Sequence, residues 1–485
     1  MRAALLALLS ALALIAAGCG GQDLGAGTDS PATMLKPGAL VYWETGSDLG
    51  SDQWQQVEEL VRRFPDGDKW LADLRRSFEE DTKLTWEEVE PALGDRFALA
   101  VYGRSTTDVQ VVGLTKPDDP EKTIELVNRA NREADTPEDR VVAREVDGWV
   151  VVSDKAASID AALKGDGGEA LADVGSFQDG MAELPDDALS RVYVDLAAAF
   201  DTFGASEPAL TKSLRMLGLD QIDFAGAWAK ARDDGAEVAG ALRGEGADKL
   251  LGATDEYSSK LLDRVPADAF AFFTFQGEGI TRQVDALRDN PLYGMALGDF
   301  EQETGVTLDD VIRLFKGEVV FYAAPGAPIP ELTILLDADD PTAARSSAER
   351  ILRSLAASGG GRVTEDGGVT TAVFEGVSVN LGSAGGALVI STSKDPFREA
   401  DAADKLADTD RYKQALEAAG APDQYASLAY VDLAETIKVI LGFASASGET
   451  VPAEVSRNLE PLRSLVAYGA KDGELATSLV FVEIQ

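Results

Sequence analysis

The sequence contains no histidine and only one cysteine, Cys19, among its 485 residues. The lack of histidine excludes Ser-His-Asp and Cys-His catalysis and the common histidine-ligated zinc sites. A single cysteine cannot form a disulfide within the chain or a CxxC redox pair. No Walker A loop, GxSxG elbow or dinucleotide fingerprint is found either. We therefore predict no catalytic residue, no bound metal and no cofactor.

Basic residues are also scarce. Lys and Arg total 44 against 84 Asp and Glu, which gives a net charge of −40. Such a surface repels phosphate backbones and anionic headgroups, so nucleic acid is not an expected partner. With 45% hydrophobic and 26% charged residues, the composition is typical of a soluble globular protein.

The N-terminus carries a targeting pattern. Arg2 precedes an apolar run from Ala3 to Ala17, which is shorter than the roughly 20 residues that cross a bilayer. Ala16-Ala17-Gly18-Cys19 resembles a bacterial lipobox, in which the cysteine is lipidated and becomes the new N-terminus. We predict a lipoprotein signal peptide over 1–18, lipidation of Cys19 and a flexible tether over 19–34. The alternative is an ordinary secretory signal. The expected location is the cell membrane, with the chain anchored by lipid on the extracytoplasmic side.

The rest of the sequence is duplicated. Five patterns recur in the same order: Pro37–Trp43 as Pro266–Phe273, Leu84–Val89 as Val306–Val311, Asp119-Pro120 as Asp340-Pro341, Val192–Leu196 as Ala429–Leu433, and Asp234-Gly235 as Asp472-Gly473. Common order at similar spacing indicates an internal repeat. We predict one domain over 35–245, a helical linker over 246–263, and a second domain over 264–485.

Each copy combines helix signals with alternating strands. Asp119-Pro120 and Asp340-Pro341 each predict a helix start, and Thr85 with Glu88 and Thr307 with Asp310 predict capping boxes. Alternating stretches turned at Asp-Gly favour antiparallel hairpins. The predicted fold class is α+β: two tandem homologous domains, each a largely antiparallel sheet with packed helices. The second copy has a Gly-rich insertion beginning at Gly359.

The motif Val265-Pro-Ala-Asp-Ala269, the lipoprotein signal and the two-half organisation resemble the bacterial envelope proteins grouped as domain of unknown function 3352. The resemblance covers nearly the whole mature chain. It implies an extracytoplasmic protein with no established activity and no assigned catalytic residues.

All six tryptophans lie in the first copy, and exposed indoles can stack on sugars or other flat ligands. Most of them align with apolar residues of the second copy: Trp43 with Phe273, Trp70 near Leu292, Trp86 with Leu308, and Trp228 with Tyr468. These are expected in the core. Trp54 and Trp149 are the least constrained and are the candidate ligand-binding residues.

Two further patterns favour structural interpretations. Ser391-Thr-Ser-Lys394 matches the SxxK of penicillin-interacting serine enzymes, but no SDN or KTG motif accompanies it, so helix capping is expected. Asp401, Asp404 and Asp408 have the spacing of one helix face, and Asp337, Asp339 and Asp340 cluster before another helix. In so acidic a chain both groups are expected to be solvated surfaces.

These features predict an extracytoplasmic binding or interaction protein of the cell envelope, without catalysis. Its partner would be an envelope ligand or protein. One alternative is a carboxylate-dependent glycan hydrolase, which needs two buried carboxylates about 5 to 9 Å apart in a cleft. The other is a carrier of apolar ligands with a large apolar cavity.

Overall fold

The computed structural model describes residues 30–485 except 106–107, 135, 205–210, 213–214, 216–217, 246, 248–254, 280, 282–300, 303–304, 327–328, 339, 375–376 and 401–402. The chain divides into two compact units. Unit 1 comprises the residues up to 246 together with 484–485, and unit 2 comprises residues 247–483. The predicted signal peptide over 1–18 and Cys19 lie outside the described residues.

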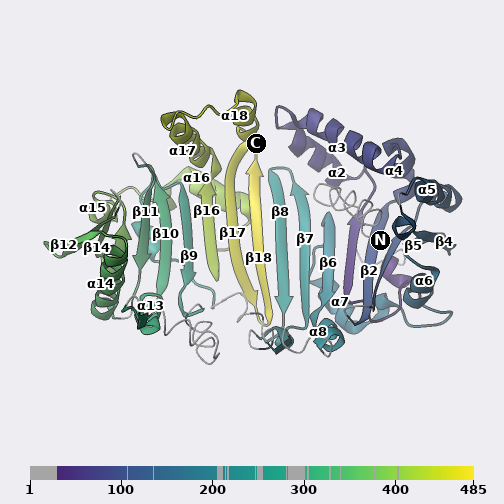
Figure 1. Ribbon diagram of the computed structural model, residues 1–485, viewed down its shortest axis with the longest axis horizontal. Coiled ribbons are helices and arrows are strands. Elements are labelled where there is room, and N and C mark those ends of the chain that lie inside the picture. The colour runs from purple at the N-terminus through teal and green to yellow at the C-terminus, as the bar shows by residue number, and fades with distance from the viewer. Residues whose placement is uncertain are drawn as a thin grey trace. The chain divides into compact units, whose positions relative to one another are not determined.

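Unit 1 is built on an antiparallel sheet (Figure 1). Its strands are β1 (Val41–Gly46), β2 (Arg96–Ser105), β3 (Asp108–Thr115), β4 (Val142–Val146), β5 (Trp149–Ser153), β6 (Ser190–Asp195), β7 (Phe224–Arg232) and β8 (Gly235–Arg243). Their order across the sheet is β4-β5-β3-β2-β1-β6-β7-β8. The first strand is therefore central, because the strands that follow it are added on both of its sides.

Helices occupy the connections of unit 1. They are α2 (Asp52–Arg62), α3 (Gly67–Thr82), α4 (Trp86–Leu93), α5 (Pro120–Glu133), α6 (Ala156–Ala162), α7 (Gly175–Ala182) and α8 (Leu196–Gly204), with short 3-10 helices η1 (Pro31–Thr33), η2 (Pro137–Asp139), η3 (Leu171–Asp173) and η4 (Leu219–Gln221). Asp119 accepts a hydrogen bond from the Lys122 backbone N–H and caps α5, as predicted. Thr85 and Glu88 form the predicted capping box of α4.

Unit 2 repeats this sheet with one addition. Its strands are β9 (Ala271–Gln276), β10 (Glu318–Ala324), β11 (Glu331–Leu336), β12 (Arg362–Asp366), β13 (Val369–Phe374), β14 (Val377–Ala384), β15 (Ala387–Ser391), β16 (Ser427–Asp432), β17 (Leu462–Asp472) and β18 (Leu475–Ile484). The order β14-β15-β11-β10-β9-β16-β17 matches β4-β5-β3-β2-β1-β6-β7 of unit 1. The hairpin β12–β13 is the addition, and it lies in the Gly-rich insertion.

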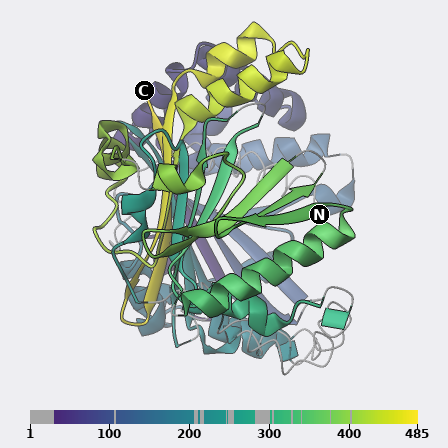
Figure 2. The same ribbon diagram turned by 90° about the vertical axis from the view of Figure 1, so that its left-hand side faces the viewer.

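The helices of unit 2 are α13 (Leu308–Leu314), α14 (Pro341–Ser358), α15 (Pro396–Ala400), α16 (Asp410–Ala419), α17 (Leu433–Ala446) and α18 (Ala453–Leu459), with 3-10 helices η5 (Leu261–Arg264) and η6 (Leu406–Asp408). Asp340 caps α14 through two backbone N–H groups, and Thr307 with Asp310 forms a capping box at α13. Figure 2 shows α14 and α17 on the same side of the sheet and α16 on the other.

Each unit has its own cluster of three aromatic rings in its core, and the two clusters are equivalent. In unit 1 the Phe177 ring lies edge-on to Tyr42 and Tyr193, with centroid distances of 5.2 and 5.1 Å. In unit 2 the Tyr412 ring lies edge-on to Phe272 and Tyr430, at 6.3 and 5.1 Å. In unit 1 the three rings come from β1, β6 and α7, and in unit 2 they come from the equivalent strands β9 and β16 and from α16. The α+β class and the largely antiparallel sheets are confirmed.

The strand registers also support the alignment of the copies. Trp43 pairs with Val192 in unit 1, and Phe273 pairs with Ala429 in unit 2. Trp228 lies opposite Arg191, and Tyr468 lies opposite Leu428. The equivalent of Trp70, Leu292, lies outside the described residues.

Three local expectations need correction. The tether does not extend to residue 34, because Ser30 caps η1, and Pro31 and Ala32 are buried. The linker is helical only in part of its described residues: Ala247 is α-helical and Leu261–Arg264 form the 3-10 helix η5, whereas residues 255–260 are not helical and Tyr257 bridges Tyr425. The predicted acidic face at 401–408 does not form on one α-helix. Asp404 lies in a bend, Asp408 ends a 3-10 helix, and Asp401 lies outside the described residues, as does Asp339 of the other cluster.

Candidate functional site

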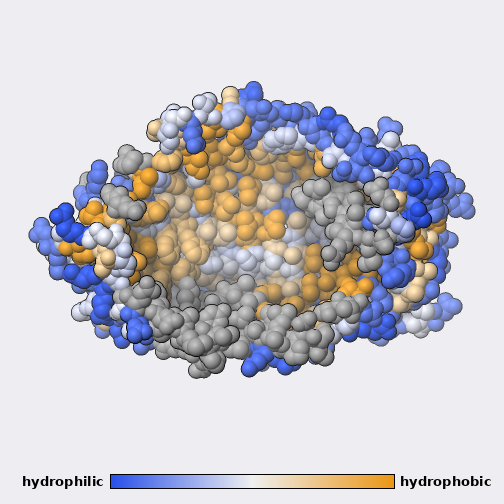
Figure 3. All heavy atoms as spheres, viewed as in Figure 1, coloured by the Kyte–Doolittle hydropathy of each residue, from blue (hydrophilic) through white to orange (hydrophobic). Residues whose placement is uncertain are grey.

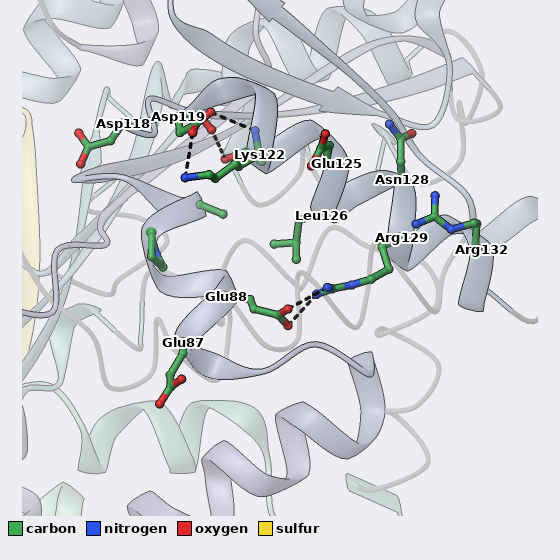
Figure 4. Close-up of a pocket in the computed structure, with 13 residues that line it drawn as sticks. Glu87, Glu88, Asp118, Asp119, Lys122, Glu125, Leu126, Asn128, Arg129 and Arg132 are labelled. Carbon is green, nitrogen blue, oxygen red and sulfur yellow. Dashed lines mark hydrogen bonds and ion pairs between the residues drawn. The ribbon is translucent and has the colours of Figure 1, made fainter.

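A charged groove lies between α4 and α5 of unit 1 (Figure 4). It has a volume of about 770 Å³ and is open to solvent. Its lining is mostly charged: Glu87, Glu88, Asp118, Asp119, Glu125, Lys122, Arg129 and Arg132, with Pro91, Ala92, Thr123, Leu126 and Asn128 between them. The groove therefore brings together several carboxylates that could act as an acid or a base.

An ion pair between the two helices occupies the middle of the groove. The Glu88 carboxylate lies 2.8 Å from Arg129 Nη1 and 2.6 Å from Nη2. It also accepts a hydrogen bond from the Thr85 backbone N–H at 3.1 Å. Hydrogen bonding from Arg129, and then from Thr85, lowers the pKa of Glu88 to about 2. A carboxylate held in this way is a poor general acid or base at neutral pH.

Unit 2 contains the same ion pair at the equivalent position. Asp310 occupies the third helical position of its capping box, as Glu88 does, and it pairs with Arg350 of α14. Arg129 and Arg350 each follow the Asp-Pro helix start by the same number of residues. Ser347 Oγ adds a hydrogen bond to Asp310 Oδ1 at 3.0 Å, and hydrogen bonding from Arg350 holds the pKa of Asp310 well below its ordinary range. In both units the ion pair thus links two helices at equivalent positions.

The SxxK serine is likewise part of the framework. Ser391 is buried at the end of β15, and its hydroxyl lies 2.6 Å from Thr333 Oγ1. It also accepts a hydrogen bond from the Ser393 backbone N–H at 3.0 Å. The equivalent residue of unit 1, Ser153, donates to the Val111 carbonyl oxygen at 2.7 Å. Both serines therefore tie a strand end to the sheet.

The structure contradicts the expected exposure of Trp54 and Trp149. Trp54 packs against Leu49 and Trp86 and is buried. Trp149 begins β5, which lies between β3 and β4, and it is buried too. Neither indole can serve as a surface platform for a flat ligand. The exposed indole is Trp70 on α3, with 41% of its surface accessible.

The buried carboxylates are held in separate networks. Glu44 bonds to Tyr42 and Arg191. Glu318 accepts from the Thr274 hydroxyl and from the backbone N–H groups of Lys260 and Leu261. Asp432 pairs with Arg411 at 2.8 Å and caps α17. Together with Asp310 these are the buried acids of the described residues, and their partners differ in every case. Over the same residues, no group of three or more acidic or other ligating side chains could hold a metal ion.

A different kind of surface is found on the sheet of unit 2. We call it the open apolar face: Phe273, Phe321, Leu332, Ala429, Ala467 and Val480, which the strand pattern places on the side that α14 and α17 share. The opposite side is closed, and Phe272, Val320, Leu428 and Tyr430 are almost fully buried there. On the open side Phe273 is 40% exposed and Leu332 58% exposed. Figure 3 shows hydrophobic residues gathered over β9, β16 and β17.

The helix α17 adds to this surface. It has no buried residue, although it carries no charge between Val439 and Ala446. Ile440 is 60% exposed and Phe443 is 51% exposed. Large apolar patches on a soluble protein commonly mark binding sites. Sequence reasoning missed this surface because its residues alternate with core residues along the same strands.

No family model matches this chain, and no curated protein matches it. Among solved structures, crystal form III of TP0453 is 13% identical, with a TM-score of 0.26, and covers 47% of this chain and 93% of its own. Crystal form IV of TP0453 is 14% identical, with a TM-score of 0.25, and covers 46% of this chain and 81% of its own. Likeness at this level carries no argument about activity. In the described part of the chain, no helix is long and apolar enough to cross a bilayer.

Proposed function

We propose that this chain is an extracytoplasmic binding protein of the cell envelope, held at the membrane by a lipid on Cys19 and without catalytic chemistry of its own. The anchor rests on the sequence pattern at 1–19. The binding role rests on contacts and surfaces found within each unit.

One observation carries the proposal: the duplication repeats framework contacts rather than a reactive constellation. The ion pairs Glu88–Arg129 and Asp310–Arg350 occupy equivalent positions. An enzyme needs nucleophiles or acid and base groups whose charge or proton can change during the reaction. Here the central ion pair of the groove, Glu88–Arg129, links two helices, whereas unit 2 presents apolar side chains to solvent.

The carrier of apolar ligands is the second candidate function, because the open apolar face offers a surface for it. The glycan hydrolase finds less support. It requires two carboxylates that face each other across a cleft. The buried carboxylates of the described residues instead neutralise arginines or cap backbone groups.

The anchor is tested by expressing the full chain in a bacterial host with radiolabelled palmitate. We expect label on the wild-type chain and its recovery with membranes. Cys19→Ala should carry no label and should leave the membrane fraction, whereas Ser10→Ala, in the apolar run, should behave as wild type. Label that persists in Cys19→Ala, or wild-type chain free of label, would refute the anchor.

The binding role is tested with the purified chain by native mass spectrometry after incubation with an extract of the host envelope. A discrete retained mass supports it. Release of sugars from purified peptidoglycan by the chain would instead establish the hydrolase.

A further inference from the structure

The open apolar face has a floor of small side chains beside a tall aromatic wall. Phe273 on β9 pairs with Phe321 on β10 on one side and with Ala429 on β16 on the other. Ala429 in turn pairs with Ala467 on β17. The rings of Phe273 and Phe321 are stacked with centroids 6.4 Å apart. Because alanine side chains are short, the sheet surface is lower beside the phenylalanines, over neighbouring strands about 4.8 Å apart.

Helices flank this depression on the same side of the sheet. The helix α14 packs on β12–β15, and α17 packs on β16 and β17. Phe275 and Phe321 lean into the core beneath α14 and are partly buried there. Phe273 lies on β9, between the strands that the two helices cover, and remains exposed, so the surface between the helices is apolar.

The side chains and backbone of this face favour a hydrocarbon ligand. Backbone groups of β9 are used in ladders with β10 and β16, and the side chains on this face are hydrocarbon. A peptide laid here in an extended conformation would bury its own N–H and C=O groups without partners, because the groups of the strand beneath it are already bonded, and this costs free energy. A hydrocarbon chain carries no such groups, and it gains from leaving water.

Charge narrows the choice further. The chain has a net charge of −40, which disfavours a second copy and an anionic headgroup. Lys438, the cation of α17, is paired with Glu435 at 2.6 Å. Anionic headgroups are therefore disfavoured, and the common membrane-lipid headgroups that remain carry no net charge.

We infer that the open apolar face, between α14 and α17, binds the acyl chain of a membrane lipid whose headgroup carries no net charge. The inference rests on the proposed binding function and names its ligand class. It places the ligand in unit 2 rather than on the tryptophans of unit 1.

The test uses the full chain with Cys19→Ser, which removes the covalent lipid, and 1-palmitoylglycerol as the probe below its aggregation concentration. Binding is followed by native mass spectrometry and calorimetric titration. We expect a single bound molecule. Phe273→Gln, which removes the wall, and Ala429→Leu, which fills the floor, should each weaken binding by about tenfold or more. Leu74→Gln is the control, because Leu74 is 40% exposed on α3 of unit 1 and so is an apolar surface residue outside the proposed site. It should bind within about twofold of the parent.

A second arm uses palmitate, which has the same chain with a carboxylate. We expect weaker binding than for 1-palmitoylglycerol at low salt, with a smaller difference at high salt because salt screens the repulsion. Thermal unfolding of each variant shows that the fold is retained. If Phe273→Gln loses its fold, Ala429→Leu provides the same test.

Three results would overturn the inference: no adduct with the parent chain, equal binding by the two groove variants and the control, or a dimer that Phe273→Gln dissociates. If 1-palmitoylglycerol does not bind but Cys19 is labelled normally, the proposed lipid site is refuted and the proposal of an anchored binding protein is retained. Loss of labelling with retained binding of 1-palmitoylglycerol refutes the anchor and keeps the site.

Discussion

The buried ion pair of unit 1 allows a prediction about stability, because unit 2 shows which residues can replace the pair. Glu44 on β1 lies opposite Arg191 on β6, and their side chains are 1% and 3% exposed. Arg191 Nη2 lies 2.5 Å from Glu44 Oε1, and Nε lies 3.1 Å from the same oxygen. At the equivalent positions unit 2 has Thr274 opposite Leu428. The same two positions thus hold a charged pair in unit 1 and two uncharged residues in unit 2, where the Thr274 hydroxyl donates to Glu318 instead.

The perturbation is Arg191→Leu. It leaves the Glu44 carboxylate buried, where the Tyr42 hydroxyl still donates a hydrogen bond to it at 2.7 Å. Removing one partner of a buried ion pair costs about 3–5 kcal/mol. With a urea m-value of about 2 kcal/mol per M, the unfolding midpoint of unit 1 should fall by roughly 2 M. The double variant Glu44→Thr with Arg191→Leu copies unit 2 and removes the unpaired charge, so it should recover more than half of the loss.

Urea unfolding followed by tryptophan fluorescence provides the assay, because the six tryptophans lie between residues 43 and 228 and report on unit 1. Asp186→Ala is the control for the other contact of Arg191, at 2.7 Å, and should cost less than about 1 kcal/mol because Asp186 is largely exposed. Two results would refute the reasoning. One is a cost below about 1 kcal/mol for Arg191→Leu. The other is a double variant as unstable as the single one, since the cost would then arise from lost packing and not from an unpaired charge.

Three further predictions concern other parts of the chain. Gly94→Ala should destabilise unit 1 by about 2–4 kcal/mol in the same assay, because a methyl group would lie 2.2 Å from a backbone carbonyl oxygen at φ +59°. Gly175→Ala, with open space at the start of α7 in the same unit, should be neutral or stabilising. The depressed pKa of Glu88 means that its contribution to stability is present above its ordinary pKa of 4.5 and is lost as the pH falls from there towards about 2, so Glu88→Gln should flatten the stability profile of unit 1 in that window. Acrylamide quenching should fall more in Trp70→Phe than in Trp149→Phe, because Trp70 is the exposed indole and Trp149 is buried, and equal losses would contradict the assigned burial.

Local signals explain what the sequence determined by itself. Asp119 and Asp340 cap helices in the structure because Asp followed by Pro satisfies an N-terminal backbone N–H and fixes the first helical φ angle. The capping boxes were readable for the same reason, since the interacting groups lie within one turn. Alternating strands and Asp-Gly turns predicted antiparallel hairpins, and the repeated order of these signals indicated the α+β duplication.

Tertiary structure decided the rest, because burial and pairing depend on what lies beside a residue in space. Trp149 is buried because β5 lies inside the sheet with α5 and α6 packed against it, and nothing next to it in the sequence records the position of these elements. Arg129 pairs with Glu88 across two helices, a contact between residues far apart in the chain. Phe272 and Phe273 are adjacent in the sequence but point to opposite sides of the sheet. The Phe272 ring is buried in the core, and the Phe273 ring is exposed on the side where α14 and α17 lie. The sequence shows the alternation, and only the packing of helices on the two sides determines which side remains open.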